Sequence, residues 1–269
     1  MSWKNSFDEG KYLYCIVNRG EEKQFGPIGI EDSSVYTVAY NNIAVVVHSC
    51  EAKPYSTMVK EKAAEWILAH QYVIDLATEE FGTVIPLTFD TIFKGNKEEL
   101  RNWLNKEYNQ LETLLKKLDG QAEYSVQIFL ETEFLDKLAS ENDEVLSIEN
   151  NLKNMSNGVA YLLKKKLQKR KELEKQLIVD RQAKELLSQI EPFVNEAILG
   201  STNKEVPEKW QDKHMILNAF CLVPKDNIGT LGSKLGQLKK EGYAVRFTGP
   251  WPPYNFVGRI NETKLVKGE

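Results

Sequence analysis

The side chains that most often carry metal or acid–base chemistry are few in this chain. Its three histidines are His48, His70 and His214, and none has a second histidine or a cysteine pair at metal-ligand spacing. No serine–histidine–carboxylate, cysteine–histidine or paired-carboxylate pattern can be assembled around them. We therefore expect no catalytic residue, no metal site and no bound cofactor. His70 is expected to be a hydrogen-bonded core histidine on the inner face of a helix.

Two glycine-containing segments lack the spacing of phosphate loops. Residues 26–29 read Gly-Pro-Ile-Gly, where proline removes a backbone donor and no helix start follows. Residues 229–234, Gly-Thr-Leu-Gly-Ser-Lys, lack the four-residue gap and the Gly-Lys-Ser order of a nucleotide-binding loop. We expect the second segment to be part of a helix that packs closely on a sheet.

Basic residues gather in one run, residues 164–171. The run could contact RNA, an anionic membrane or an acidic protein. However, Glu172 and Glu174 follow it, and leucines mark an inner face, so a solvated helix face is the favoured interpretation. The net charge of −4 argues against a nucleic-acid partner, and no apolar stretch is long enough for a membrane span.

The cysteines and the N-terminus indicate a cytoplasmic protein. Cys15, Cys50 and Cys221 are odd in number and widely spaced, which is typical of reduced thiols and not of a disulfide framework. The first nine residues lack the apolar segment of a signal peptide.

Residues 249–257, Gly-Pro-Trp-Pro-Pro-Tyr-Asn-Phe-Val, combine three aromatic rings with a backbone stiffened by three prolines. Such a segment, here called the C-terminal hook, loses little conformational entropy when it packs against something. It could fold back on the core or contact a partner, and both can hold together. We expect Trp251 to belong to the core and Tyr254 to contact a partner, with Phe256 in the same partner-binding segment.

Six segments in chain order resemble the gas vesicle protein F/L family. Residues 69–73 match its Ala-His-x-x-Val helix, and residues 84–93 match its Val-x-Pro-x-x-Phe-x-x-x-Phe segment. The C-terminal hook resembles the family's C-terminal signature. The other three resemble an opening strand, a glycine-containing loop and an apolar strand, at residues 12–17, 25–30 and 43–47. Together the matches cover most of residues 11–257.

The periodicity of the first half predicts strands and two helices. Strands are expected at 11–17, 34–40, 42–48, 83–89 and 123–130, with Asn41 and Asn42 in a tight turn. Helices are expected at 57–80, with Thr57 as a cap, and at 97–118. This order predicts a ferredoxin-like variant of an α+β sandwich, with both helices on one face of a mainly antiparallel sheet.

The second half predicts a long helix over 156–190, then a strand at 214–223, a helix at 226–240 and a strand at 243–247. The fold class is therefore α+β with two domains. We place an N-terminal ferredoxin-like domain at 1–130 and a C-terminal α+β domain with a long helical segment at 131–269. The strand at 123–130 could belong to either domain.

The family resemblance implies a non-catalytic accessory or minor structural protein of gas vesicle assembly, in the cytoplasm and at the vesicle. Its implied partners are the hydrophobic main shell protein and other accessory proteins. Pro86 indicates that strand 83–89 lies at a sheet edge or carries a bulge. At an edge, Pro86 and Thr88 could take part in strand addition. An alternative function is a small-ligand-sensing regulatory module of ferredoxin-like type.

Overall fold

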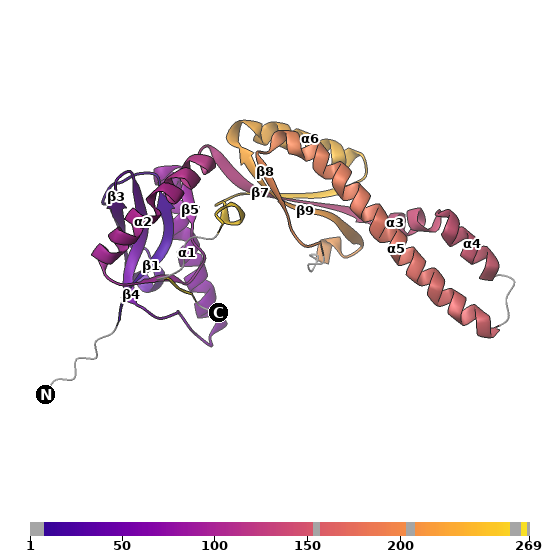
Figure 1. Ribbon diagram of the computed structural model, residues 1–269, viewed down its shortest axis with the longest axis horizontal. Helices are drawn as coiled ribbons and strands as arrows, with labels where there is room; N and C mark the ends of the chain where they lie inside the picture. Colours follow the sequence, from indigo (N-terminus) through magenta and orange to yellow (C-terminus); the bar gives the residue numbers. More distant parts are fainter. Residues whose placement is uncertain (1–7, 153–156, 203–207, 259–264, 268–269) are drawn as a thin grey trace. The chain divides into compact units, whose positions relative to one another are not determined.

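The computed structural model describes residues 8–152, 157–202, 208–258 and 265–267, and it is an α+β structure. The chain forms two compact units, Met1–Glu123 together with Pro250–Glu269, and Tyr124–Gly249 (Figure 1). The sequence predicts a single boundary at 130 with the whole tail in the second domain. The structure instead returns the tail to the first unit, because residues 254–256 and 265–267 pack and pair there.

The first unit is built around one sheet with the strand order β11-β6-β1-β4-β3-β2, and β5 also pairs with β1. Its strands are β1 (Glu9–Val17), β2 (Gln24–Pro27), β3 (Ser34–Tyr40), β4 (Ile43–Glu51), β5 (Val84–Pro86), β6 (Thr91–Lys94) and β11 (Leu265–Lys267). Its strands pair in antiparallel fashion, as β1 does with β4, β5 and β6. β1 is the central strand, and it is buried from Gly10 to Val17.

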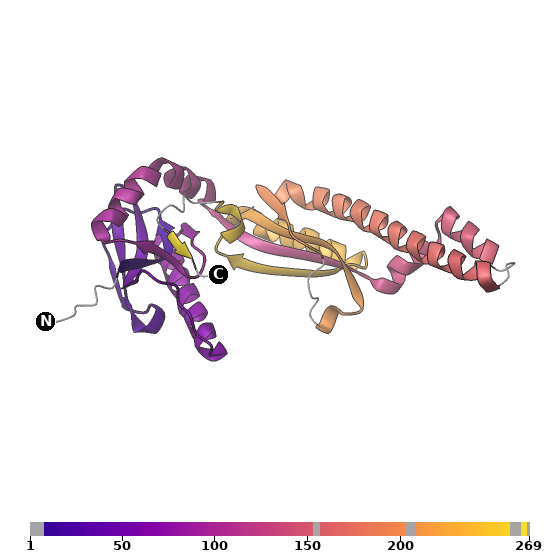
Figure 2. The same ribbon diagram turned by 60° about the horizontal axis from the view of Figure 1, so that its bottom comes forward.

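Two helices of equal length cover this sheet, α1 (Lys60–Phe81) and α2 (Lys97–Leu118). They lie on opposite faces of the sheet (Figures 1 and 2). The expectation that both cover one face is therefore wrong. The physical reason is that β1 is apolar on both faces, so each face needs a covering layer.

Local sequence signals account for most helix ends and turns in the first unit. Asn96 accepts hydrogen bonds from the amides of Glu98 and Glu99, a capping box that starts α2 at the expected residue. Asn41 has a φ of 50° in the predicted turn between β3 and β4. The expected cap Thr57 is wrong, because α1 begins at Lys60 with Val59 as its N-cap.

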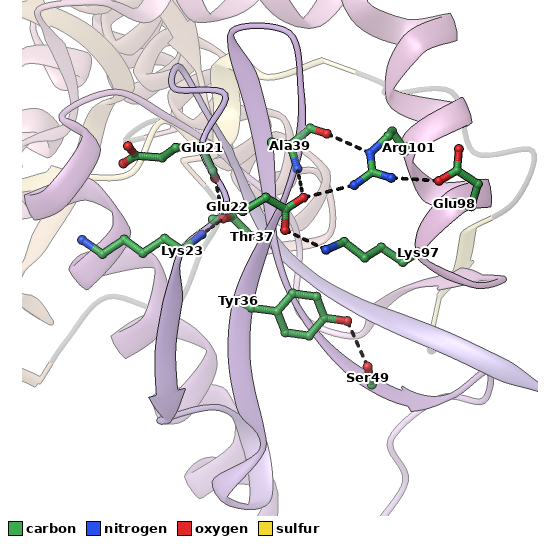
Figure 3. A network of polar contacts seen from close by, with 10 residues as sticks. All are labelled: Glu21, Glu22, Lys23, Tyr36, Thr37, Ala39, Ser49, Lys97, Glu98 and Arg101. Carbon is green, nitrogen blue, oxygen red and sulfur yellow. Dashed lines mark hydrogen bonds and ion pairs between the residues drawn. The ribbon is translucent and has the colours of Figure 1, made fainter.

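A polar network ties the segment between β1 and β2 to α2 (Figure 3). The carboxylate of Glu22 accepts hydrogen bonds from Lys97 at 2.7 Å and from Arg101 at 3.1 Å. Arg101 also donates to the carbonyl of Ala39 at 3.2 Å and pairs with Glu98 at 2.8 Å. These contacts fix α2 against the β2–β3 end of the sheet.

The second unit contains a four-stranded sheet of order β10-β7-β9-β8. Its elements are β7 (Gln121–Glu131), α3 (Thr132–Ser140), α4 (Asp143–Leu152), α5 (Asn157–Ile190), β8 (Glu196–Leu199), β9 (Lys213–Pro224), α6 (Ile228–Lys240) and β10 (Ala244–Trp251). Along the chain these elements follow one another as one strand, three helices, two strands, one helix and one strand. In the first unit the sequence predicts the order β-β-β-α-β-α-β, whereas the structure has β-β-β-β-α-β-β-α.

The long helix α5 agrees with the prediction of a helix over 156–190. α3 and α4 pack along it, as Figure 1 shows. Within the basic run, Arg170 pairs with Glu144 at 3.1 Å and Lys171 pairs with Glu149 at 2.6 Å. The lysines 164–166 and 169 are exposed, as the prediction of a solvated helix face requires, whereas Arg170 and Lys171 are partly covered by α4.

Several short elements were not expected from the sequence, namely β2, β6, β8 and β11. Single 3₁₀ turns also occur at Ile30–Asp32, Glu191–Phe193, Glu208–Trp210, Lys225–Asn227 and Tyr254–Phe256. Across the described ranges, no helix has the length and apolarity that crossing a membrane requires.

Candidate partner-binding surface

The C-terminal hook packs on the first unit through Tyr254 and Phe256. Phe256 is 5% exposed, and Tyr254 is half-buried against the core cluster that contains Tyr12, Tyr14 and Trp66. Burial raises the pKa of the Tyr254 hydroxyl. The aromatic residues after the two prolines thus anchor the hook in place.

Trp251 lies on the surface, with 50% of its side chain exposed. The expectation that Trp251 belongs to the core is therefore wrong, whereas a partner contact of the partly exposed Tyr254 stays a prediction. Trp251 ends β10, before Pro252 and Pro253 turn the chain toward the core, so its ring is left outside. The prolines orient the hook, but the buried rings are those that follow them.

The segment around Pro86 forms a shorter strand than expected. Val84–Pro86 pairs with β1, where Pro86 lies opposite Cys15, and in the described part of the chain β1 is the one strand that pairs with it. Pro86 is buried, and both helices contact this strand. Thr88 is exposed after the strand ends, and its carbonyl accepts a hydrogen bond from the Thr91 hydroxyl at 2.7 Å. Thr88 is therefore the accessible residue of this pair.

The outer face of α1 carries apolar side chains that are exposed to solvent. Ile67, Leu68 and Tyr72 are 52%, 68% and 53% exposed. Their neighbour Gln71 accepts a hydrogen bond of 3.4 Å from the Tyr254 hydroxyl, so the hook lies against the flank of this face. We refer to Ile67, Leu68 and Tyr72 as the α1 outer face.

The α1 outer face is not predicted from the sequence, because one apolar stripe is enough to account for an amphipathic helix. The expected inner stripe is correct at Trp66, His70, Val73 and Ala77, which are all buried. The sequence also contains a second set of apolar residues, Ile67, Leu68 and Tyr72, which lie between Trp66 and Val73 of the inner stripe. An apolar helix that has only one face covered signals a binding surface.

Beneath α1 the first unit holds a buried network of histidines and tyrosines. The Nδ1 atom of His70 lies 2.9 Å from the Tyr12 hydroxyl, and its Nε2 atom lies 3.1 Å from the carbonyl of Leu87. His48 is bonded on both ring nitrogens to the hydroxyls of Tyr14 and Tyr55, at 2.7 and 3.0 Å. The network satisfies buried polar groups, which is a structural role.

Burial of both imidazoles lowers their pKa values to about 4, which keeps them neutral at pH 7. No group of three or more histidine, cysteine or carboxylate side chains in the described ranges could hold a metal ion.

A family model described as gas vesicle synthesis protein GvpL/GvpF matches residues 10–258. The chain belongs to the GvpL/GvpF family. The matched region covers both units and ends one residue beyond the C-terminal hook.

Curated members of the GvpL/GvpF family resemble the chain over nearly its whole length. Gas vesicle protein L1 of Halobacterium salinarum is 29% identical, over 96% of this chain and 94% of its own length. Gas vesicle protein L of Haloferax mediterranei is 27% identical, over 92% and 87%. Gas vesicle protein F1 of Halobacterium salinarum is 24% identical, over 93% of each chain.

The fold agrees with solved GvpF structures. The crystal structure of GvpF from Anabaena sp. PCC7120 superposes with a TM-score of 0.72 at 18% identity, over 94% of this chain and all of the other. GvpF from Microcystis aeruginosa gives 0.65 at 19% identity, over 93% and 99%. These likenesses establish the α+β fold of the GvpL/GvpF family for this chain.

Proposed function

We propose that the chain is a non-catalytic accessory or minor structural protein of gas vesicle assembly. In this proposal it acts in the cytoplasm and at the growing vesicle. It binds the hydrophobic main shell protein and other accessory proteins. Membership of the GvpL/GvpF family supports the assembly role, because the relatives named above are gas vesicle proteins.

The observation that carries the binding proposal is the α1 outer face. Three large apolar side chains more than half exposed on adjoining positions of one helix favour contact with another apolar surface. A shell subunit with an apolar face aggregates unless something covers that face. A helix that presents Ile67, Leu68 and Tyr72 offers such cover.

The residues expected from the sequence have distinct roles in this proposal. Trp251 contacts the partner directly, since half of its side chain is exposed to solvent. Tyr254 links the hook to α1 through its hydrogen bond to Gln71, and the buried Phe256 anchors the segment that follows Trp251. Pro86 ends β5, and Thr88 offers the accessible backbone for strand addition.

The test is capture of the main shell protein by purified variants. Leu68→Asp places a charge in the α1 outer face, and we expect it to lose most of the captured shell protein while its melting temperature stays close to that of the wild type. Leu162→Asp is the matched control, because Leu162 of α5 is also 68% exposed and lies in the other unit. Equal capture by both variants and the wild type contradicts the proposed surface.

A second candidate function is small-ligand binding. One observation favours it, a pocket of about 560 Å³ in the first unit. A ligand that binds there and leaves shell-protein capture unchanged would add a function and would not replace the first.

A further inference from the structure

The pocket lies between the segment that follows β4 and the first turns of α1. It is lined by residues 49–51 and 53–56, by Lys62 and Trp66 of α1, and by Glu31 from the turn before β3. Its volume of about 560 Å³ is in the range of small-molecule sites.

Two aromatic rings form a corner in this pocket. The rings of Tyr55 and Trp66 meet edge to face, with centroids 5.2 Å apart and planes inclined at 76°. Trp66 is 7% exposed, so its ring is fixed by packing. The Tyr55 hydroxyl is bonded to His48, and the Tyr55 amide donates to Asp90 at 2.9 Å. The corner is therefore rigid before any ligand arrives.

A lysine of the chain itself occupies the corner. The ammonium of Lys62 lies 5.0 Å from the centre of the Trp66 ring and 2.8 Å from a carboxylate oxygen of Glu31. An aromatic face together with a carboxylate is the arrangement that proteins use to recognise organic cations. The side chain of Lys62 remains 48% exposed, so it can leave the corner without unfolding α1.

The backbone that carries Glu31 is held in an unusual conformation. Glu31 and Asp32 have φ angles of 52° and 55°, which non-glycine residues rarely adopt. Backbone strain of this kind persists where the surrounding structure enforces it, and it is common at ligand sites. Here it presents the Glu31 carboxylate to Lys62 beside the Trp66 ring.

From these contacts we propose that the pocket binds an alkylammonium group, with Lys62 as an internal stand-in that the ligand displaces. The ligand's ammonium takes the place beside Glu31 and Trp66, and the rest of the ligand fills the remaining volume toward residues 49–56. The cation comes either from a free polyamine or from a lysine side chain of a peptide. This site goes beyond the assembly function and does not depend on it.

The experiment is isothermal titration of the full chain with spermidine and, separately, with an acetylated lysine-containing tetrapeptide, at low ionic strength. We expect Lys62→Gln to bind at least one probe about tenfold more tightly than the wild type, because the internal competitor is gone. The indole N–H resonance of Trp66 should shift during the titration. Glu31→Gln should lose the binding, alone and combined with Lys62→Gln.

Lys60→Gln is the matched control, because it removes the same charge from an exposed position at the start of α1. A gain for Lys60→Gln equal to that for Lys62→Gln would show a general charge effect and overturn the proposal. So would undiminished binding by Glu31→Gln, or no binding of either probe to a folded Lys62→Gln variant. Binding of spermidine alone supports the site with a free polyamine as ligand, and binding of the peptide alone supports it with a partner's lysine.

Discussion

Glu123 and Asn255, which are 132 positions apart in the sequence, are joined by two hydrogen bonds. The backbone N–H of Asn255 donates to one carboxylate oxygen at 2.9 Å, and its side-chain Nδ2 donates to the other at 2.6 Å. Glu123 is only 4% exposed. Burial raises the pKa of this carboxyl group, although the bonds from Asn255 act against the rise. The pair fastens the C-terminal hook to the end of the first unit.

Asn255→Asp should release the hook. It replaces a donor with a carboxylate beside the buried carboxylate of Glu123, and we expect a loss of roughly 1–3 kcal/mol in the free energy of unfolding. Urea unfolding measures the loss, and limited proteolysis should cut the tail sooner. Asn109→Asp, at an exposed position of α2, is the control. Equal free energies of unfolding for Asn255→Asp and Asn109→Asp would mean that the Glu123–Asn255 pair does not stabilise the fold.

In the C-terminal hook Phe256 is buried and Trp251 is accessible, so we expect the first to stabilise the fold and the second to bind a partner. Phe256→Ala removes a side chain that is 5% exposed and should cost roughly 3–5 kcal/mol. Trp251→Ala removes one that is half exposed and should cost under about 1 kcal/mol, while capture of the shell protein falls. Denaturant melts and pull-downs of both variants test this division. A stability loss for Trp251→Ala as large as that for Phe256→Ala would contradict it.

Much of the fold could be predicted because its signals are local. The capping box at Asn96 and the turn at Asn41 each depend on a few neighbouring residues, so α2 and the β3–β4 hairpin were located correctly. The strands that escaped prediction are four residues or shorter, as at β2, β6 and β8, and too short for a pattern to show.

The site was harder to predict because it depends on contacts across long stretches of chain. The sequence shows that residues 249–257 are rigid and aromatic, but which rings are buried depends on packing against distant residues, as in the contact of Tyr254 with the core cluster. The corner at Trp66 could not be predicted from the sequence either, because Glu31, Tyr55 and Lys62 come from three separate segments. Sequence resemblance was enough to indicate the gas vesicle protein family, whereas the pocket is formed only in the folded chain.

The segment at Pro86 and Thr88 can be tested for strand addition. Thr88→Pro removes one backbone donor after β5 while keeping the carbonyl that Thr91 bonds. We expect Thr88→Pro to capture clearly less shell protein than the wild type, while its melting temperature falls only slightly. Thr88→Val is the control, because it removes the hydroxyl and keeps the backbone donor. Unchanged capture by a folded Thr88→Pro variant would exclude this segment from the interface.

The buried histidines should make stability depend on pH. The pKa values of His48 and His70 are lowered to about 4 from an ordinary 6.5, so between these pH values the unfolded chain binds more protons than the folded chain. Stability is therefore complete above pH 6.5 and is lost as the pH falls toward 4. The loss is up to about 3 kcal/mol for each histidine.

Urea unfolding at a series of pH values from 7 to 4.5 measures this dependence. His70→Gln removes one of the two titrations and should give a flatter profile, even though the variant is less stable throughout because the Tyr12 hydroxyl loses its bond to the imidazole and keeps the one from the Asp90 amide. His214→Gln replaces an exposed histidine instead and is the matched control. If His70→Gln and His214→Gln give the same slope, the His70 imidazole is not the group whose protonation weakens the fold.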